Sequence, residues 1–125
     1  MSSNPIKVLL VEDNLVASKM GALIISELGC GIDVATDGEE AVALVKENDY
    51  DLILMDLGLP KMDGFDATLA IRKISTKNFI PIVALTAHSD KQNQQRVKEV
   101  GMNGFSVKPL TTESCQELVN RYVKK

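Results

Sequence analysis

Short apolar runs alternate along the chain with longer segments in which apolar residues recur every three or four positions. A run of four to six apolar residues is typical of a buried strand, and apolar residues at every third or fourth position are typical of a helix. The runs predict five strands, at Ile6–Val11, Ile32–Ala35, Asp51–Met55, Ile80–Leu85 and Phe105–Val107. The other segments predict five helices, at Asn14–Leu28, after Asp37, at Gly64–Ile74, at Ser89–Val100 and after Thr111.

Several residues predict where these helices begin and end. Gly29 and Gly101 are natural helix stops. Asp37 is a helix cap with Glu40 at the capping-box position, and Asp63 is a cap before Gly64. The apolar residues that indicate the first helix are Val16, Met20, Leu23, Ile24 and Leu28.

The alternation of strands and helices predicts the fold class. Strands joined through helices are crossover-connected and therefore parallel. Strands that are almost continuously apolar have both faces of their sheet covered. We therefore expect a doubly wound α/β sandwich, formed by a single domain over residues 1–125 with its core at about 6–122.

Composition excludes several classes of protein. The 125 residues are 45% hydrophobic and 25% charged, with a net charge of −3, which argues against a nucleic-acid-binding surface and a polybasic membrane anchor. No apolar run approaches the roughly 18 residues of a membrane-spanning helix. The first ten residues hold no basic-then-apolar segment, so we expect no secretion signal. Cys30 and Cys115 match no metal-binding or disulfide spacing. We expect a cytoplasmic domain without contact to membrane or nucleic acid.

Polar residues follow four of the five predicted strands. In doubly wound sheets, ligands bind outside the carboxyl ends of the strands. The residues at these ends are Glu12, Asp13, Asp56, Thr86, Lys108 and Pro109. Because the fold brings these ends to one edge of the sheet, we expect the side chains to lie together.

Five of these six residues also have an ordinary structural interpretation. Asp13 with Asn14 can cap the first helix, and Asp56 can cap a turn before Pro60. Thr86 can make a local hydrogen bond, Lys108 can be solvated and Pro109 can end a strand. Taken singly, each interpretation is as good as a functional one, but the common destination of all six favours a site.

Electrostatics indicates what such a site would bind. Two carboxylates ~5 Å apart repel by roughly 3 kcal/mol at an effective dielectric constant of about 20. Three of them need a cation, a proton or an amine, and Lys108 supplies only one positive charge. The donors are oxygens and the chain has one histidine, His88, which favours Mg²⁺ or Mn²⁺ over zinc. Mg²⁺ coordinates one or two carboxylates together with a phosphoryl oxygen, so the pattern indicates phosphoryl chemistry.

Four segments at these strand ends resemble the receiver domain of two-component response regulators. They are Val11–Asn14, Leu54–Gly64, Ala84–Ala87 and Gly104–Pro109. The resemblance runs from about Ile6 to Tyr122 and is closest to receivers of hybrid sensor histidine kinases. It implies a flavodoxin-like (βα)₅ fold with strand order 2-1-3-4-5. A stand-alone response regulator remains the alternative context.

The resemblance implies how the site would bind its ligands. Asp56 would accept a phosphoryl group from a phosphohistidine on a sensor histidine kinase or a histidine phosphotransfer protein. Mg²⁺, or Mn²⁺, would be held by Glu12, Asp13, Asp56 and the carbonyl of Gly58. The domain would promote its own phosphorylation and dephosphorylation without being a turnover enzyme on its own.

The resemblance also implies how the domain would respond. Lys108, joined to Pro109 by a cis peptide bond, would pair with the phosphoryl oxygens. Thr86 would move to hydrogen-bond the phosphoryl group, and Phe105 would swing inward behind it, although Phe105 can equally be a core aromatic. Partner recognition in this family commonly uses the first helix, here Asn14–Leu28.

Two further residues are expected at the rim of the site. Gly58 lies where relatives usually carry a larger side chain, and a turn glycine with positive φ is its structural interpretation. His88 lies two residues after Thr86, where an exposed loop residue is the simpler interpretation. Our hypothesis is that Gly58 and His88 together tune the lifetime of the acyl phosphate.

Three other functions share parts of the pattern. A dehalogenase-type aspartyl phosphatase needs a second acid where this chain has Gly58, and a cap domain for which 125 residues leave no room. A flavin or dinucleotide module would carry Gly-x-Gly-x-x-Gly after the first strand, which is absent. An interaction domain with an inactive site stays open until Asp56 is shown to accept phosphate.

Overall fold

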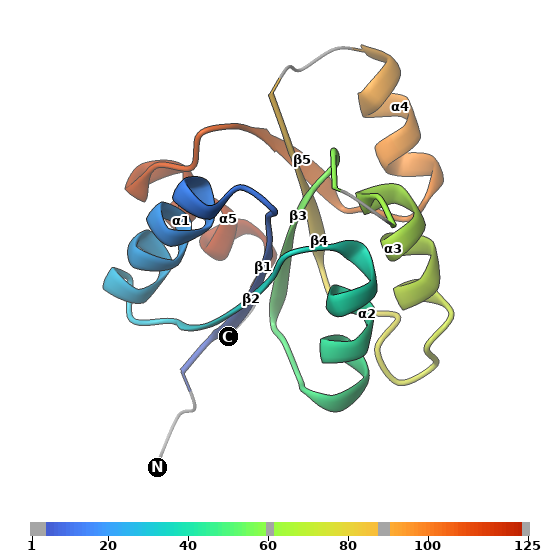
Figure 1. Ribbon diagram of the computed structural model, residues 1–125, viewed down its shortest axis with the longest axis horizontal. Helices are drawn as coiled ribbons and strands as arrows, with labels where there is room; N and C mark the ends of the chain where they lie inside the picture. Colours follow the sequence, from blue (N-terminus) through green and yellow to red (C-terminus); the bar gives the residue numbers. More distant parts are fainter. Residues whose placement is uncertain (1–4, 60–61, 88–90, 124–125) are drawn as a thin grey trace.

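The computed structural model describes residues 5–59, 62–87 and 91–123, with the backbone alone for 91–93. Its strands are β1 (Lys7–Val11), β2 (Gly31–Ala35), β3 (Leu52–Asp56), β4 (Ile82–Thr86) and β5 (Gly104–Val107). Its helices are α1 (Leu15–Glu27), α2 (Gly38–Glu47), α3 (Gly64–Arg72), α4 (Lys91–Glu99) and α5 (Thr112–Tyr122). The strands form one parallel sheet in the order β2-β1-β3-β4-β5 (Figure 1), which confirms the predicted fold class.

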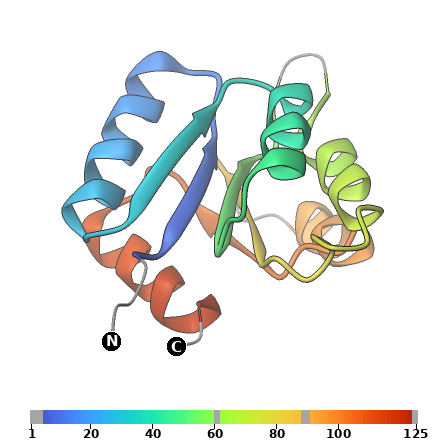
Figure 2. The ribbon, with the colours of Figure 1, turned by 90° about the horizontal axis from the view of Figure 1, so that it is seen from below.

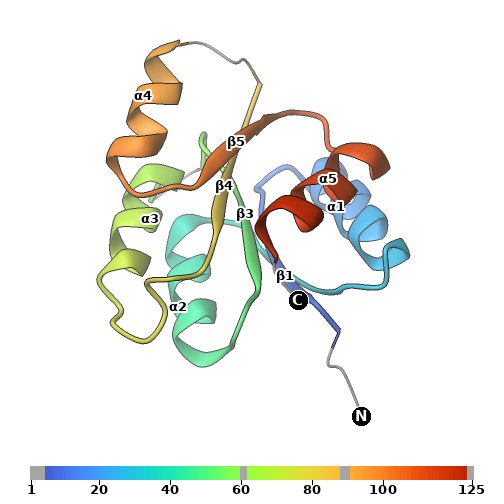
Figure 3. The same cartoon turned by 180° about the vertical axis from the view of Figure 1, so that it is seen from behind.

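The sheet separates two helical layers and two hydrophobic clusters. Alternate residues of β1 serve the two sides, because Leu9 and Val11 pack with α2, α3 and α4, whereas Val8 and Leu10 pack with α1 and α5. Figures 1 and 3 show α1 and α5 on one side of the sheet and the other three helices opposite. Burial on both faces explains why β1, β3 and β4 read as continuous apolar runs.

The carboxyl ends of the strands lie along one edge of the sheet. At the opposite edge, Ile6 before β1 and Val123 after α5 line the same pocket, and Figure 2, the view from below, shows the start of β1 near the end of α5. Among the described residues, no helix combines the length and the apolar character needed to cross a bilayer.

Most predicted element boundaries shift by one or two residues. The strand predicted from Ile80 begins at Ile82, since Pro81 has no N–H to donate; the Pro81 carbonyl accepts from Ile53 N–H at 2.9 Å. The helix predicted to Ile74 ends at Arg72. Gly29 and Gly101 follow their helices with φ of 85° and 96°, as expected of helix stops.

The predicted helix caps are present, with one difference. Asp37 and Asp63 accept from the backbone N–H groups three residues on, at 2.8 and 2.9 Å. The capping-box position of Glu40 predicts that its carboxylate reaches back to the cap residue itself. It instead accepts from the N–H and hydroxyl of Thr36, one residue earlier, at 2.7 and 3.0 Å. A reciprocal capping box occurs at Thr111, through its side-chain partner Ser114.

The apolar spacing that predicts α1 marks its buried face only in part: Ile24 and Leu28 pack against the hydrophobic cluster, whereas the other predicted residues do not. Ser18, Gly21 and Ile25 are the buried residues of this helix. Four apolar residues of α1 are instead more than half exposed: Leu15, Val16, Met20 and Leu23. We call these four side chains the α1 apolar surface.

The two cysteines should differ in reactivity. Cys115 is fully buried, and burial raises the pKa of its thiol to about 11, whereas Cys30 is partly exposed. Because the thiolate is the reactive form, we expect iodoacetamide at pH 8 to modify Cys30 first and Cys115 only after unfolding in urea. Peptide mass spectrometry of samples taken over time measures the modification rate of each cysteine. Equal rates for the two cysteines in native protein would contradict the expectation.

Candidate functional site

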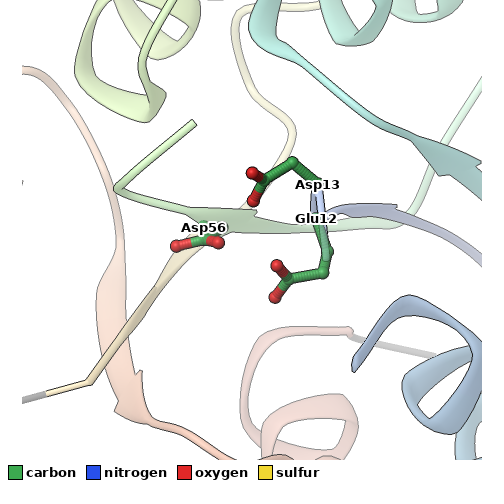
Figure 4. Close-up of side chains that lie close together, drawn as sticks. All are labelled: Glu12, Asp13 and Asp56. Carbon is green, nitrogen blue, oxygen red and sulfur yellow. The ribbon is translucent and has the colours of Figure 1, made fainter. Parts of the chain in front are cut away.

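Three carboxylates converge at the carboxyl edge of the sheet (Figure 4). Glu12 and Asp13 directly follow β1, and Asp56 is the last residue of β3. One oxygen of each lies within 4.8 Å of the others. Glu12 and Asp56 are 3% and 6% exposed, while Asp13 is exposed. The parallel pairing of β1 with β3 thus brings together acids that lie more than forty positions apart in the sequence.

Lys108 provides the positive charge of this cluster. Its Nζ lies 3.0 Å from Asp56 Oδ2 and 3.2 Å from Glu12 Oε1. Its backbone N–H donates to the Thr86 carbonyl at 2.7 Å, and its peptide bond to Pro109 is cis. The interpretation of Lys108 as a merely solvated lysine is therefore wrong.

Glu12 is the carboxylate most affected by its surroundings. Burial raises its pKa above the usual glutamate value, and the neighbouring Asp56 adds to this rise. The Asn14 N–H, which donates to Glu12 Oε2 at 3.1 Å, and Lys108 act in the opposite direction. Asn14 also caps α1 through its side chain, as its structural interpretation predicts. Without a further cation, the site therefore holds Glu12 at an electrostatic cost.

The surroundings of Lys108 favour its charged form. Burial by itself would lower its pKa, but the hydrogen bond and charge of Asp56, together with Glu12, raise it above the usual lysine value. The ammonium group is therefore retained at neutral pH, where it can bind an anionic group.

Both carboxylate oxygens of Asp56 have partners. Oδ2 accepts from Lys108, and Oδ1 accepts from the Gly58 N–H at 3.1 Å. The second bond is the local turn that the structural interpretation of Asp56 predicts. In this residue the turn and the acidic cluster occur together, so the two interpretations do not exclude each other.

Gly58 does not need the conformational freedom of glycine. Its φ lies outside the left-handed region, and among the described residues beyond its two chain neighbours no atom would lie within 4 Å of a Cβ built on it. The interpretation as a turn glycine with positive φ is therefore wrong, and a side chain would enter open space. His88, the other residue expected at the rim, lies outside the described residues.

Thr86 and Phe105 occupy neighbouring strands beside the acids. Thr86, at the end of β4, is 6% exposed and lines a cleft with the three acids and Lys108. Phe105 on β5 pairs with Ala84 and is 37% exposed. Phe105 is therefore not a core aromatic in this structure, and the core interpretation is wrong.

Sequence reasoning missed one wall of the cleft. Phe65, in the first turn of α3, lines the cleft, and the guanidinium carbon of Arg96 on α4 lies 4.2 Å from its ring centroid. This geometry is a cation–π contact. No local pattern could reveal it, because the two residues belong to different helices.

The carboxylates are arranged suitably for one divalent ion. Ligand oxygens of an octahedral Mg²⁺ lie roughly 2.9 to 4.2 Å apart. The three acids present their oxygens within 4.8 Å of one another, so small side-chain movements would complete such a set. Three acids against one lysine also leave a negative excess that a divalent cation would neutralise.

Comparison with known sequences identifies the family. The model of the response regulator receiver domain matches residues 8–120. Hybrid signal transduction histidine kinase B of Dictyostelium discoideum is 46% identical in an alignment of 117 positions that covers 85% of this chain and 6% of that protein. Transcription factor SKN7 of Chaetomium thermophilum is 38% identical over 119 residues, covering 94% of this chain and 15% of that protein. The chain thus spans less than a fifth of either relative.

Solved structures agree with this result. Chemotaxis protein CheY4 of Vibrio cholerae superposes with a TM-score of 0.92 at 32% identity, covering 96% of this chain and 100% of that one. The receiver domain of sensor histidine kinase PA1611 from Pseudomonas aeruginosa, with a magnesium ion in its active site cleft, gives a TM-score of 0.88 at 34% identity, covering 95% and 98%.

A third similar structure contains a partner. The co-crystal of the Saccharomyces cerevisiae histidine phosphotransfer signaling protein Ypd1 with the receiver domain of Ssk1 gives a TM-score of 0.88 at 28% identity, covering 95% of this chain and 89% of that one. Family model, relatives and fold lead to one conclusion. The chain belongs to the response regulator receiver domain family of two-component signalling.

Proposed function

We propose that Asp56 accepts a phosphoryl group from a phosphohistidine and thereby switches the domain. The observation that carries this proposal is the joint placement of Glu12, Asp13 and Lys108 around Asp56. An isolated aspartate is a weak nucleophile and repels an incoming phosphoryl group. Neighbours that neutralise the negative charge on the transferring oxygens reduce this repulsion.

The same residues would hold a magnesium ion. Glu12, Asp13, Asp56 and the carbonyl of Gly58 are its proposed ligands, and Mn²⁺ is an alternative ion of the same chemistry. When bound, the ion neutralises charge on the phosphoryl oxygens. A similar receiver domain, that of PA1611, holds magnesium in its active site cleft, which supports the proposal.

The transfer itself forms one bond and breaks another. A carboxylate oxygen of Asp56 bonds to phosphorus, the phosphorus–nitrogen bond of the donor breaks, and the imidazole takes up a proton. The product is an acyl phosphate. Lys108, already 3.0 Å from Asp56, is placed to follow the negative charge onto the phosphoryl oxygens.

We extend the proposal to Thr86 and Phe105 as the responding residues. Phosphorylation adds about −1.5 to −2 charge and strong hydrogen-bond acceptors beside the Thr86 hydroxyl. Phe105 shares a sheet face with Thr86, since the parallel register pairs Ala84 with Phe105 and Thr86 with Val107. A movement of Thr86 toward the phosphoryl group would open space on this face, which the part-exposed Phe105 ring can enter.

The α1 apolar surface is the proposed docking site for the phosphodonor. A groove lined by Val16 and Met20 also contains Glu12 and Lys108, so this surface is continuous with the acidic site. A contiguous apolar patch beside a reactive group is typical of a protein-binding surface. The similar receiver of Ssk1 binds the phosphotransfer protein Ypd1, which supports a donor of that class or a sensor histidine kinase.

Charge placed in this surface should separate docking from chemistry. Met20, 56% exposed on α1, becomes charged in Met20→Glu. We expect transfer from a phosphotransfer protein that serves the wild type to slow by about tenfold, which corresponds to about 1.4 kcal/mol of docking. Phosphorylation by acetyl phosphate should stay unchanged. Leu69→Glu on α3, 44% exposed, is the matched control, and equal donor rates for both variants would exclude α1 as the docking face.

The wider context is proposed from the relatives. The 46% identity to a hybrid histidine kinase favours a receiver within a phosphorelay of that kind. A response regulator that acts alone is the alternative, because CheY4, which is covered completely by the match, has the same fold.

Gly58 is proposed to shorten the lifetime of the acyl phosphate. Its missing side chain leaves open space beside Asp56, through which water can reach the phosphorus. In Gly58→Asn we expect the half-life after removal of excess donor to lengthen by roughly threefold to tenfold, a barrier change of about 1 kcal/mol. Gly58→Ala is the control for backbone effects. An unchanged half-life in Gly58→Asn would refute the hypothesis.

The proposed function is tested by intact-mass measurement. Purified protein is incubated with acetyl phosphate and Mg²⁺, and we expect the mass to increase by one phosphoryl group. The increase should disappear when EDTA removes the metal and return when Mg²⁺ is restored. Protein that gains no mass under these conditions would contradict the proposal and favour an interaction domain with an inactive site.

A further inference from the structure

The start of α3 lies directly against the peptide group that follows Asp56. Gly64, the first residue of α3, is buried. A Cβ built at Gly64 would lie 2.5 Å from the Asp56 carbonyl oxygen and 3.2 Å from the Leu57 Cα. Real Cβ atoms essentially never come within 3.0 Å of another heavy atom. A side chain at position 64 would therefore push against the backbone that joins Asp56 to Gly58.

The start of α2 supports the loop after β3 from another side. Gly38, the first residue of α2, is buried against the backbone of Met62. A Cβ there would collide with the Met62 carbonyl oxygen and would lie 2.8 Å from its carbonyl carbon. Met62 immediately precedes Asp63, which caps α3. Figures 1 and 2 show α2 and α3 side by side.

The two glycines occur in the same local pattern. Each follows an N-cap aspartate and precedes a fully buried alanine, in the segments Asp37–Ala41 and Asp63–Ala67. Glycine is a poorer helix former than alanine in a helix interior. Close backbone approach is the physical reason to have glycine at both helix starts.

We propose that Gly64 and Gly38 are positioning residues for phosphoryl transfer. By allowing two helix starts to contact the chain around Asp56, they fix the Asp56 carboxylate and the Gly58 carbonyl relative to Glu12 and Asp13. This inference rests on the proposed function, because it concerns the same ligands. An error of 1 Å in such an arrangement can reduce a rate by about 10²-fold.

Two other glycines provide matched controls. Gly31, at the start of β2 and away from the acidic site, would give a Cβ only ordinary contacts of 3.7 and 3.9 Å, so Gly31→Ala adds a methyl group without a collision. Gly104 at the start of β5 faces the Tyr122 side-chain oxygen, so Gly104→Ala creates a collision with a side chain of α5. Gly104→Ala thereby tests whether lost stability alone changes the site.

The experiment measures metal binding and stability in the same variants. Mg²⁺ dissociation constants come from calorimetric titration, phosphorylation rates from intact mass at saturating Mg²⁺, and unfolding free energies from urea denaturation. Trimethylamine oxide is present throughout to keep destabilised variants folded. We expect Gly64→Ala to weaken Mg²⁺ binding by about tenfold and to slow phosphorylation by about 10²-fold. Gly38→Ala should change both quantities in the same direction.

The controls should separate a displacement of the Mg²⁺ ligands from a general loss of folding stability. Gly104→Ala should lose stability, while Gly104→Ala and Gly31→Ala should both keep the wild-type Mg²⁺ dissociation constant. Wild-type Mg²⁺ affinity and rate in folded Gly64→Ala would overturn the inference. If Gly64→Ala does not fold, wild-type Mg²⁺ affinity and phosphorylation rate in Gly38→Ala would overturn the inference. Failure of the wild type itself to bind Mg²⁺ or to gain a phosphoryl group would instead refute the proposed function.

Discussion

Replacing Asp56 by asparagine is expected to abolish phosphorylation of the protein. Asparagine keeps the shape of the side chain, and its amide oxygen can still accept from the Gly58 N–H or from Lys108. It has no anionic oxygen with which to attack phosphorus. Intact mass after incubation with acetyl phosphate and Mg²⁺ should therefore stay at the unmodified value.

The control is a second strand carboxylate that is held by comparable bonds. Asp33 on β2 accepts from the Tyr50 hydroxyl at 2.7 Å and lies 3.4 Å from Lys7, away from the acidic cluster. Asp33→Asn should be phosphorylated at the wild-type rate. A full phosphoryl increment in Asp56→Asn would show that another residue is the acceptor.

Replacing Lys108 by methionine is expected to slow phosphorylation by roughly 10²- to 10³-fold, the usual effect of removing one group that stabilises transition-state charge. The ammonium group contacts both Asp56 and Glu12, and it is the cation of the cluster among the described residues. Mg²⁺ should bind at least as tightly as in the wild type, because a positive charge next to the metal site is removed. A slow rate with retained Mg²⁺ binding would locate the defect in transfer and not in metal binding.

Lys77 offers a matched lysine elsewhere in the fold. Its side chain is 12% exposed and lies 2.7 Å from Asp49. Lys77→Met loses an ion pair of a largely buried lysine without touching the acidic cluster, so its phosphorylation rate should be that of the wild type. A rate for Lys108→Met within threefold of the rate for Lys77→Met would contradict the role given to Lys108.

The sheet was predictable because its strands are short apolar runs that do not resemble helices. Leu52–Asp56 and Ile82–Thr86 are buried on both faces, so nearly every residue in them carries the signal. The edge strand β2 and the helix α1 show a weaker hydrophobic pattern. The α1 apolar residues indicate a helix, but the buried face uses Ser18 and Gly21, which no hydrophobicity pattern would select.

The position of the acids was predictable for a topological reason. Parallel strands place all carboxyl ends at one edge, so residues after β1, β3, β4 and β5 meet whatever their separation in sequence. The distances between them, the part-exposed position of Phe105 and the open space at Gly58 depend on how the layers pack. Contacts such as Phe65 with Arg96 join separate helices and leave no local pattern.

The central claim is that one residue, Asp56, carries the phosphoryl group, and chemical trapping tests it most directly. Borohydride reduces an aspartyl phosphate to homoserine, which peptide mass spectrometry locates by residue. After phosphorylation and reduction, we expect homoserine at position 56 and at no other aspartate. Homoserine at Asp13, or reduced protein with every aspartate intact despite a phosphoryl mass increment, would contradict the claim.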